Sequence, residues 1–192
     1  MPVAALDGVG NGKLFGKEHQ MRTTRLIPIF TCACLLLVNY TAQAQTDIKA
    51  IVVKHLTTSR DFTLRVAEQM PEADYAFKLT PPQMSFAEQM AHLAEEQAGL
   101  LAPFTGAPPQ RSKPASMSKK DVMAFVRQSF DQSIATVSKL TPAQISKTYS
   151  GGEGSMTGLE LLMFVLDHTT HHRASAEMYL RAKGITPAEY QF

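Results

Sequence analysis

The chain has 192 residues, of which 44% are hydrophobic and 19% are charged, a length that fits one domain with at most a small second one. Its 19 basic and 17 acidic residues give a net charge of +2, so neither a basic nucleic-acid-binding surface nor an acidic disordered tail is expected. The two cysteines, Cys32 and Cys34, are too few for a disulfide scaffold or a cysteine-based zinc finger.

The N-terminal region carries the features of a secretory leader. Arg22 and Arg25 precede an apolar run over residues 26–38, which has the length of a signal-peptide core and is short for a membrane span. The sequence Ala42-Gln43-Ala44 follows this run and matches the small-x-small pattern after which signal peptidase cuts. We therefore predict cleavage after this tripeptide; an uncleaved membrane anchor is the alternative.

This leader, residues 21–44, sets the expected boundaries of the protein. Met21 is the expected start of translation, because residues 1–20 lie upstream of a complete signal peptide and form an extension of it. Cleavage leaves one domain, residues 45–192, in the periplasm or outside the cell and without a membrane segment. Both cysteines leave with the leader, so the exported domain depends on its core alone.

The first helix is predicted over residues 46–69, where apolar residues recur at helical spacing and Pro71 ends the pattern. Residues 70–84 contain three prolines and are predicted to form a long connection. The second helix begins after Ser85, because Glu88 stands three residues later and completes a capping box. Its apolar stripe consists of Phe86, Met90, Leu93, Leu100, Leu101 and Phe104.

The third helix is predicted to begin after Ser118, an N-cap residue with Asp121 at the N3 position, and it follows a loop at 103–117. The pair Thr141-Pro142 combines an N-cap with proline at the first helical position, and it predicts a short helix. Residues 150–155 are rich in glycine and serine and are predicted to form a flexible turn.

The last helix is predicted to run from about Thr157 to Lys183, with Gly184 as its C-cap. No segment shows a convincing alternation of apolar and polar residues, so no strand is predicted. The four main helices therefore predict an all-α fold, a four-helix bundle preceded by a cleavable signal peptide.

The middle of the last helix carries the candidate functional residues. An almost continuously apolar stretch, residues 158–166, leads into the histidine-rich sequence that contains His168, His171 and His172. His168 and His172 are four residues apart and therefore share one helix face, where two imidazoles can hold one divalent ion. His171 points to another side and is a weaker ligand candidate. Two partly exposed surface histidines are the alternative interpretation.

A metal site needs a further ligand from another helix. Outside the last helix, the expected mature domain contains only His55 and His92. His92 lies at the flank of the second helix's apolar stripe and can face a cleft between helices, so it ranks first. His55 lies midway along the first helix, where it is a fourth ligand, a proton shuttle or an exposed side chain.

Three stretches resemble the DinB/YfiT-like superfamily of metal-binding four-helix bundles. Residues 85–95 are similar to the family's second-helix histidine segment, residues 167–173 to its HxxHHR segment, and residues 179–190 to its closing YLR-x-KG-I-x-P pattern. The chain departs from the family where Arg173 is followed by Ala174-Ser175 instead of Gly-Gln, and in having no tryptophan.

The resemblance implies a three-histidine site made of His92, His168 and His172, and a fold like that of the family over residues 46–192. The ion that it implies is zinc or nickel, with iron or manganese as further options. Water completes the shell in such relatives, and a homodimer is the assembly they suggest.

Such an ion supports a metal-dependent hydrolase, or a transferase that uses a low-molecular-weight thiol as in some relatives, with a small-molecule substrate that the sequence does not name. Glu96, one turn after His92, is the best-placed general base, and His171 and His55 are alternatives. Asp167 and Arg173 are candidates for orienting the ligands. Export disfavours the thiol transferase, because small thiols are mostly cytosolic. A non-catalytic metal- or ligand-binding envelope protein is the competing hypothesis.

Overall fold

The computed structural model describes the backbone of residues 27–106, 108, 112–151 and 154–191, and side chains within these ranges from residue 48 onward. The chain divides into two units, residues 1–39 and residues 40–192. The bundle and every contact described below belong to the second unit.

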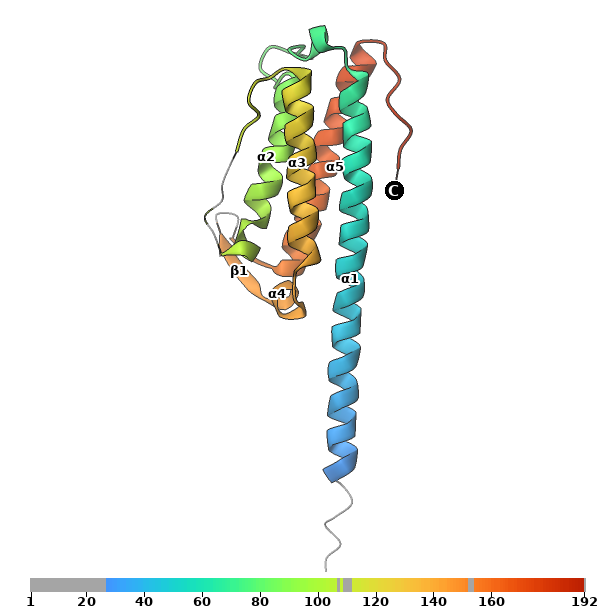
Figure 1. Ribbon diagram of the computed structural model, residues 1–192, viewed down its shortest axis with the longest axis vertical. Helices are drawn as coiled ribbons and strands as arrows, with labels where there is room; N and C mark the ends of the chain where they lie inside the picture. Colours follow the sequence, from blue (N-terminus) through green and yellow to red (C-terminus); the bar gives the residue numbers. More distant parts are fainter. Residues whose placement is uncertain (1–26, 107, 109–111, 152–153, 192) are drawn as a thin grey trace, which may run out of the picture. The chain divides into compact units, whose positions relative to one another are not determined.

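The bundle consists of four long helices that lie side by side (Figure 1); the first of them belongs to the second unit only from residue 40 onward. Their bounds are α1 Ile27–Gln69, α2 Phe86–Thr105, α3 Lys119–Ser138 and α5 Gly158–Ala182. α1 and α5 run in one direction, and α2 and α3 run in the other, so the connection between α2 and α3 returns along the bundle (Figure 1). This is a four-helix bundle with one long crossover connection, and the predicted helical fold is confirmed.

The helix starts follow the predicted capping residues. Ser85 and Glu88 make both hydrogen bonds of a capping box at the start of α2, and Ser118 accepts from the backbone N–H of Asp121 at the start of α3. The short helix α4, Pro142–Ser146, has Thr141 as its N-cap. Each cap satisfies backbone donors that a helix start leaves without partners, which is why it marks the boundary so clearly. The connection after α1 contains a single 3-10 turn, Glu72–Asp74.

Two predictions are wrong. The loop expected at 103–117 begins later, because α2 continues through Pro103 to Thr105. The region expected to be a flexible turn forms a β-hairpin. Strand β1, Thr148–Gly151, pairs antiparallel with β2, Gly154–Thr157, with Tyr149 opposite Met156. Each strand is only four residues long and places one partly buried apolar side chain, Tyr149 or Met156, against the core. Strands this short do not give a convincing period-two signal in the sequence. The hairpin leads directly into Thr157, which caps α5.

The core fills the space between the four long helices. Its largest fully buried apolar side chains come from all four of them and from the residue after α1: Leu56, Phe62, Met70, Phe86, Met90, Leu93, Phe130, Leu162 and Leu180. The predicted stripe of the second helix is buried except for Leu100, which packs against the core from its edge. This burial is the main favourable contribution to folding.

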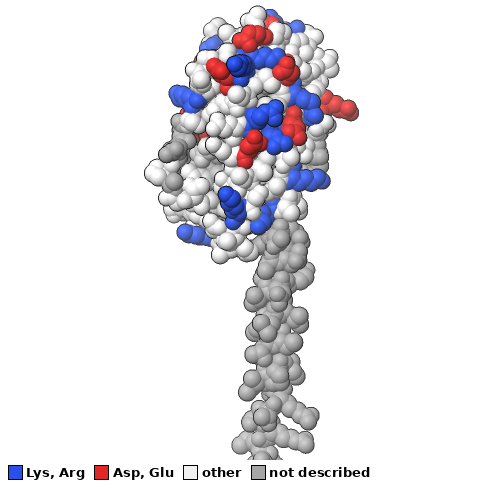
Figure 2. All heavy atoms as spheres, viewed as in Figure 1, with Lys and Arg blue, Asp and Glu red and all other residues white. Residues whose placement is uncertain are grey.

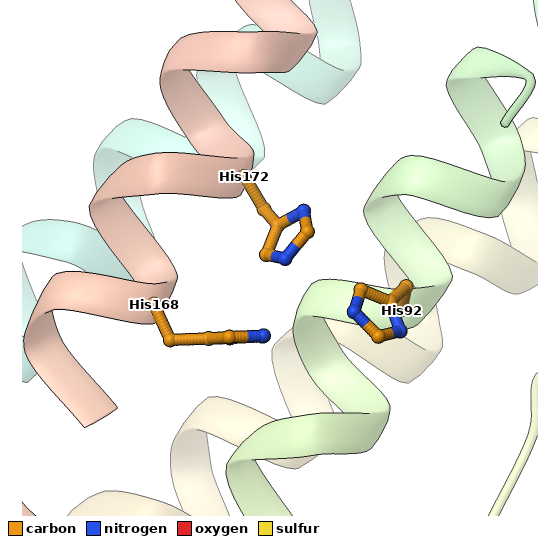
Figure 3. Close-up of side chains that lie close together, drawn as sticks. All are labelled: His92, His168 and His172. Atoms are coloured by element: carbon orange, nitrogen blue, oxygen red, sulfur yellow. The ribbon is translucent and has the colours of Figure 1, made fainter. Parts of the chain in front are cut away.

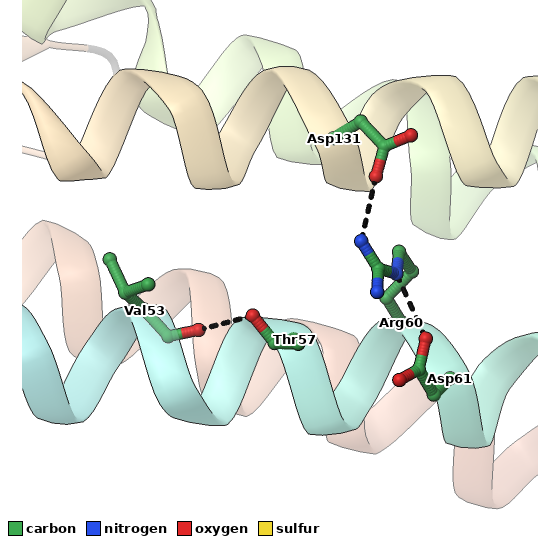
Figure 4. Close-up of polar contacts among 5 residues, drawn as sticks. All are labelled: Val53, Thr57, Arg60, Asp61 and Asp131. Carbon is green, nitrogen blue, oxygen red and sulfur yellow. Dashed lines mark hydrogen bonds and ion pairs between the residues drawn. The ribbon is translucent and has the colours of Figure 1, made fainter.

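The surface of the bundle carries charges of both signs. Basic and acidic side chains lie beside one another on the face shown in Figure 2. Arg60 of α1 illustrates the pairing, since it contacts Asp61 and Asp131 of α3, each at 2.9 Å (Figure 4). These carboxylates raise the pKa of Arg60 through hydrogen bonds and charge. Because neighbouring charges of opposite sign largely cancel, the electrostatic potential over this face is small.

The predicted leader lies mostly outside the described residues. Of residues 21–44, the structure describes only the helical backbone from Ile27 onward, as part of α1. The start at Met21 and the cleavage after Ala44 therefore stay predictions. Within the described part of the chain, none of the helices combines the length and the apolar composition needed to cross a membrane.

Candidate metal centre

Three histidines from two helices meet on one side of the bundle. His92 lies in α2, and His168 and His172 lie one turn apart on the same face of α5 (Figure 3). One ring nitrogen from each lies within 4.8 Å of the other two. The ring centroids are 4.4 Å apart for His168 and His172, and 4.6 and 5.4 Å from His92 to His172 and His168. The structure therefore brings together the three predicted ligands.

The surroundings favour neutral imidazoles at His168 and His172. All three side chains are half-buried. Burial, followed by the charges of His168, His92 and His171, lowers the pKa of His172 to about 4. Burial and the charge of His92 also lower the pKa of His168, although nearby Glu96 opposes the shift. Neutral rings have the free lone pairs that a metal ion requires.

Gln89 contacts the cluster from inside the bundle. It lies three residues before His92 in α2 and is only 7% exposed, so its side chain shares the face of His92. Its Nε2 lies 2.7 Å from Nδ1 of His172. A hydrogen bond at Nδ1 fixes the ring's orientation and decides which nitrogen is free to bind a metal.

A buried hydrogen-bond network lies beside the histidines. Gln97 of α2 is fully buried; its Nε2 donates to Oγ1 of Thr169 at 3.2 Å, and its Oε1 accepts from Ser133 of α3 at 3.0 Å. Thr169 follows His168 directly and donates to the backbone oxygen of Val165. The network ties α2, α3 and α5 together and so sets the distance between the helices that carry the histidines.

The donor set fits a divalent transition-metal ion. Three imidazoles and an open position are typical of catalytic zinc and suit nickel, iron and other borderline ions as well. Nδ1 of His168 is buried and has no hydrogen-bond partner, and a buried polar atom without a partner is a costly exception in proteins. The cluster can therefore hold one metal ion.

The other predicted residues lie around this cluster. His171 is exposed, with its ring 4.9 Å from that of His172, and it does not belong to the three-ligand group. Glu96 is half-buried, and its charge acts on His168. Among the described residues, the group also leaves out His55, which lines a separate cavity with Arg173.

Sequence reasoning did not find Gln89, nor the network of Gln97, Thr169 and Ser133. Gln89 carried a usable signal, since it stands one turn before His92. The network had none, because its contacts depend on how three helices are placed.

The comparisons with known proteins agree with this fold. The chain is 23% identical over 141 residues to the uncharacterized protein YjoA of Bacillus subtilis (strain 168), covering 70% of this chain and 90% of that protein. The crystal structure of that DinB-like protein has a TM-score of 0.64 at 21% identity, covering 72% of this chain and 95% of the other. A DinB-like protein from Bacillus cereus ATCC 10987 gives 0.64 at 14% identity, with 73% and 95% covered.

At these identities the two structures support the fold alone. The sequence profile of the DinB superfamily, however, matches residues 55–176. That range includes all three histidines of the cluster, the whole of α2 and α3, most of α5 and the last part of α1. The chain therefore belongs to the DinB superfamily.

Proposed function

We propose that this protein is an exported metal-dependent enzyme whose single divalent ion is held by His92, His168 and His172. The observation that supports the proposal is the convergence of three ring nitrogens within 4.8 Å on two helices. Zinc or nickel is the expected ion, with iron and manganese as alternatives. The depressed pKa values of His168 and His172 support a site ready to bind metal near neutral pH.

A bound ion in this site supplies a Lewis acid that lowers the pKa of water or of a thiol in its open position. The protein itself supplies the three ligands, the orientation of His172 by Gln89, and a carboxylate near the ligands. Glu96 is our candidate for the general base, because its charge reaches His168. His171 is the second candidate, because its exposed ring adjoins His172 and can exchange protons with solvent.

Hydrolysis of a small molecule is the reaction class that we favour. The alternative is transfer of a group to a low-molecular-weight thiol, and the predicted export argues against it because such thiols are mostly cytosolic. The proposal would therefore change with the predicted cleavage after Ala44. If the leader were absent, the thiol-dependent transferase would become the better hypothesis.

A non-catalytic ligand-binding role is the second candidate function. It is favoured by a cavity of about 540 Å³ between α1 and α5, which is separate from the three-histidine cluster and is lined by both apolar and polar side chains, His55 among them. A protein of this kind would bind metal and ligand without turning the ligand over.

The first experiment is elemental analysis of the untagged protein beside a His168→Ala/His172→Ala double variant. The proposal predicts close to one ion per chain in the wild type and a loss of that ion in the double variant. Absence of metal from the wild type, even after incubation with zinc or nickel, would contradict it. A hydrolase screen then compares the metal-loaded wild type with Glu96→Gln. A Glu96→Gln variant that keeps its metal but loses turnover would support catalysis. No turnover by the metal-loaded wild type would favour the binding role.

A further inference from the structure

Arg173 is a buried arginine that makes no ion pair with any of the described residues, although the charge of Glu177, one turn later in α5, acts on it. It lies in α5 with 3% of its surface exposed. Its Nε has no hydrogen-bond partner, and its contacts are a 3.4 Å hydrogen bond to Ser59 and the ring of Phe62 at 4.5 Å. Among the described residues, no acidic side chain lies within ion-pair distance of it. Arg60, in contrast, has two carboxylates at 2.9 Å (Figure 4).

A buried charge normally has a counter-charge, because removal from water is costly for an isolated ion. The contacts of Arg173 with the ring face of Phe62 and with one hydroxyl group compensate for only part of the hydration that the charge loses on burial. The guanidinium group carries five N–H donors, and its contacts with Ser59 and Phe62 use only some of them. An anion from outside the chain would complete its surroundings.

The cavity between α1 and α5 gives such an anion access to Arg173. Its volume of about 540 Å³ lies within the range of roughly 300–1,000 Å³ that is common for small-molecule sites. The C-terminal segment runs beside it, held by hydrogen bonds between Gln69 and the backbone of Thr186 and Ala188. Tyr190 of this segment packs its ring edge-to-face on Phe62 and lines the cavity.

The lining of the cavity is divided into two parts. Arg173 shares one part with polar residues, which are His55, Thr58, Ser59, Asp167 and Thr170. The other part is apolar and consists of Ile48, Ile51, Val52, Leu159, Met163 and Leu166. Ile51 and Met163 are 54% and 55% exposed, which is unusual for large apolar side chains. Exposed apolar surface beside a charged group is the pattern of a site for an amphipathic ligand.

We propose that this cavity binds a small carboxylate with an apolar tail, its carboxylate on Arg173 and its tail along Ile51 and Met163. A guanidinium group suits a carboxylate because two parallel N–H donors match its two oxygens. Asp167 also lines the cavity and would repel a second negative charge, so a monoanion fits better than a phosphate ester. The site lies on a different face of α5 from the metal centre. It does not depend on the proposed metal-dependent activity, and it would supply the ligand of the non-catalytic alternative.

The test titrates the full chain, labelled with ¹³C-methyl methionine, with octanoate, octan-1-ol and acetate. Octanoate is expected to shift the Met163 methyl signal saturably, with a dissociation constant of roughly 0.1–1 mM for a ligand of this size. The signals of Met117 and Met178, which are exposed elsewhere, should not move. Octanol lacks the charge and acetate lacks the apolar tail, so each should bind at least tenfold more weakly than octanoate when the affinities are measured by calorimetry.

Two variants separate the two parts of the site. Met163→Glu places a negative charge in the apolar part and should weaken octanoate binding at least tenfold. Met178→Glu is its matched control, on the same helix with the same 55% exposure, and should bind within twofold of the wild type. Arg173→Met should also lose at least tenfold. If it does not fold, Met163→Glu and the comparison of octanoate with octanol decide the question.

Three results would overturn the proposal: no saturable shift of Met163, equal affinity for octanoate and octanol, or an unchanged affinity in Met163→Glu. The His168→Ala/His172→Ala variant should keep wild-type octanoate binding. This last result distinguishes failure of the anion site from failure of the metal site.

Discussion

The hydrogen bond between Gln89 and His172 predicts a measurable role for Gln89 in metal affinity. A metal on the other ring nitrogen of His172 requires a proton on Nδ1, and that N–H needs an acceptor. The amide of Gln89 lies 2.7 Å away and can present its oxygen to the N–H by a half-turn of the amide group. Gln89→Met keeps the volume and removes this acceptor.

The expected loss is about 10- to 100-fold in metal affinity, which is the usual cost of removing a partner that orients a ligand. That range corresponds to about 1.4–2.7 kcal/mol. Gln89→Glu should keep or increase the affinity, because a carboxylate accepts the Nδ1–H more strongly than an amide. Both variants change the same side chain, which is only 7% exposed. A general effect of substitution would weaken metal binding in both, whereas the proposed hydrogen bond predicts weaker binding only in Gln89→Met.

The assay is competition for zinc between the protein and a chromophoric chelator at pH 7.5. Gln132→Met, at an exposed glutamine of α3, controls for a general effect of the substitution. Far-UV circular dichroism checks the fold, because the chain has no tryptophan for fluorescence. An affinity of Gln89→Met within twofold of the wild type would refute the inference that Gln89 orients His172.

Three further predictions concern stability and pH. Gly158→Ala should destabilise the protein by about 3 kcal/mol or more, because the new Cβ would meet backbone atoms of Ile145 at 2.8 and 2.9 Å. The loss would be measured as a lower midpoint of urea unfolding. An unchanged midpoint would contradict this packing. Ser133→Ala removes the hydroxyl that donates to buried Gln97 and should lower the free energy of unfolding by about 1–3 kcal/mol in the same assay. A change below about 0.5 kcal/mol would mean that the network does not stabilise the fold. By NMR, His172 of the metal-free protein should titrate near pH 4 and not near 6.5. Because the unfolded ring binds its proton more readily, stability should be complete above about pH 6.5 and fall as the pH is lowered toward 4; a midpoint near 6.5 would show that the cluster does not lower this pKa.

The helices were predictable because their boundary signals are local. Ser85 and Ser118 each satisfy donors within the next three residues, so the sequence alone shows where α2 and α3 begin. The β-hairpin was not predictable in the same way. Its short strands are recognised by pairing, Thr148 with Thr157 for example, and pairing depends on the turn between them and on the cap of α5.

The metal cluster was predictable in part. The spacing of His168 and His172 places them on one helix face, and the position of His92 at the flank of an apolar stripe ranked it above His55 as their partner. The complete set of three ligands, however, was implied by the resemblance to the DinB family. The structure places His55 at the cavity of Arg173 instead. The burial of Arg173 without an ion pair among the described residues could not be foreseen, because a sequence does not show which cations become buried.

X-ray absorption spectroscopy of the zinc-loaded protein can show whether one metal ion is bound by three histidines from two helices. We expect a spectrum with three imidazole ligands in the wild type and in His55→Ala. His92→Ala should lose one imidazole or release the ion. Two or fewer imidazoles in the wild type, or an unchanged spectrum in His92→Ala, would show that these three histidines do not bind the metal together.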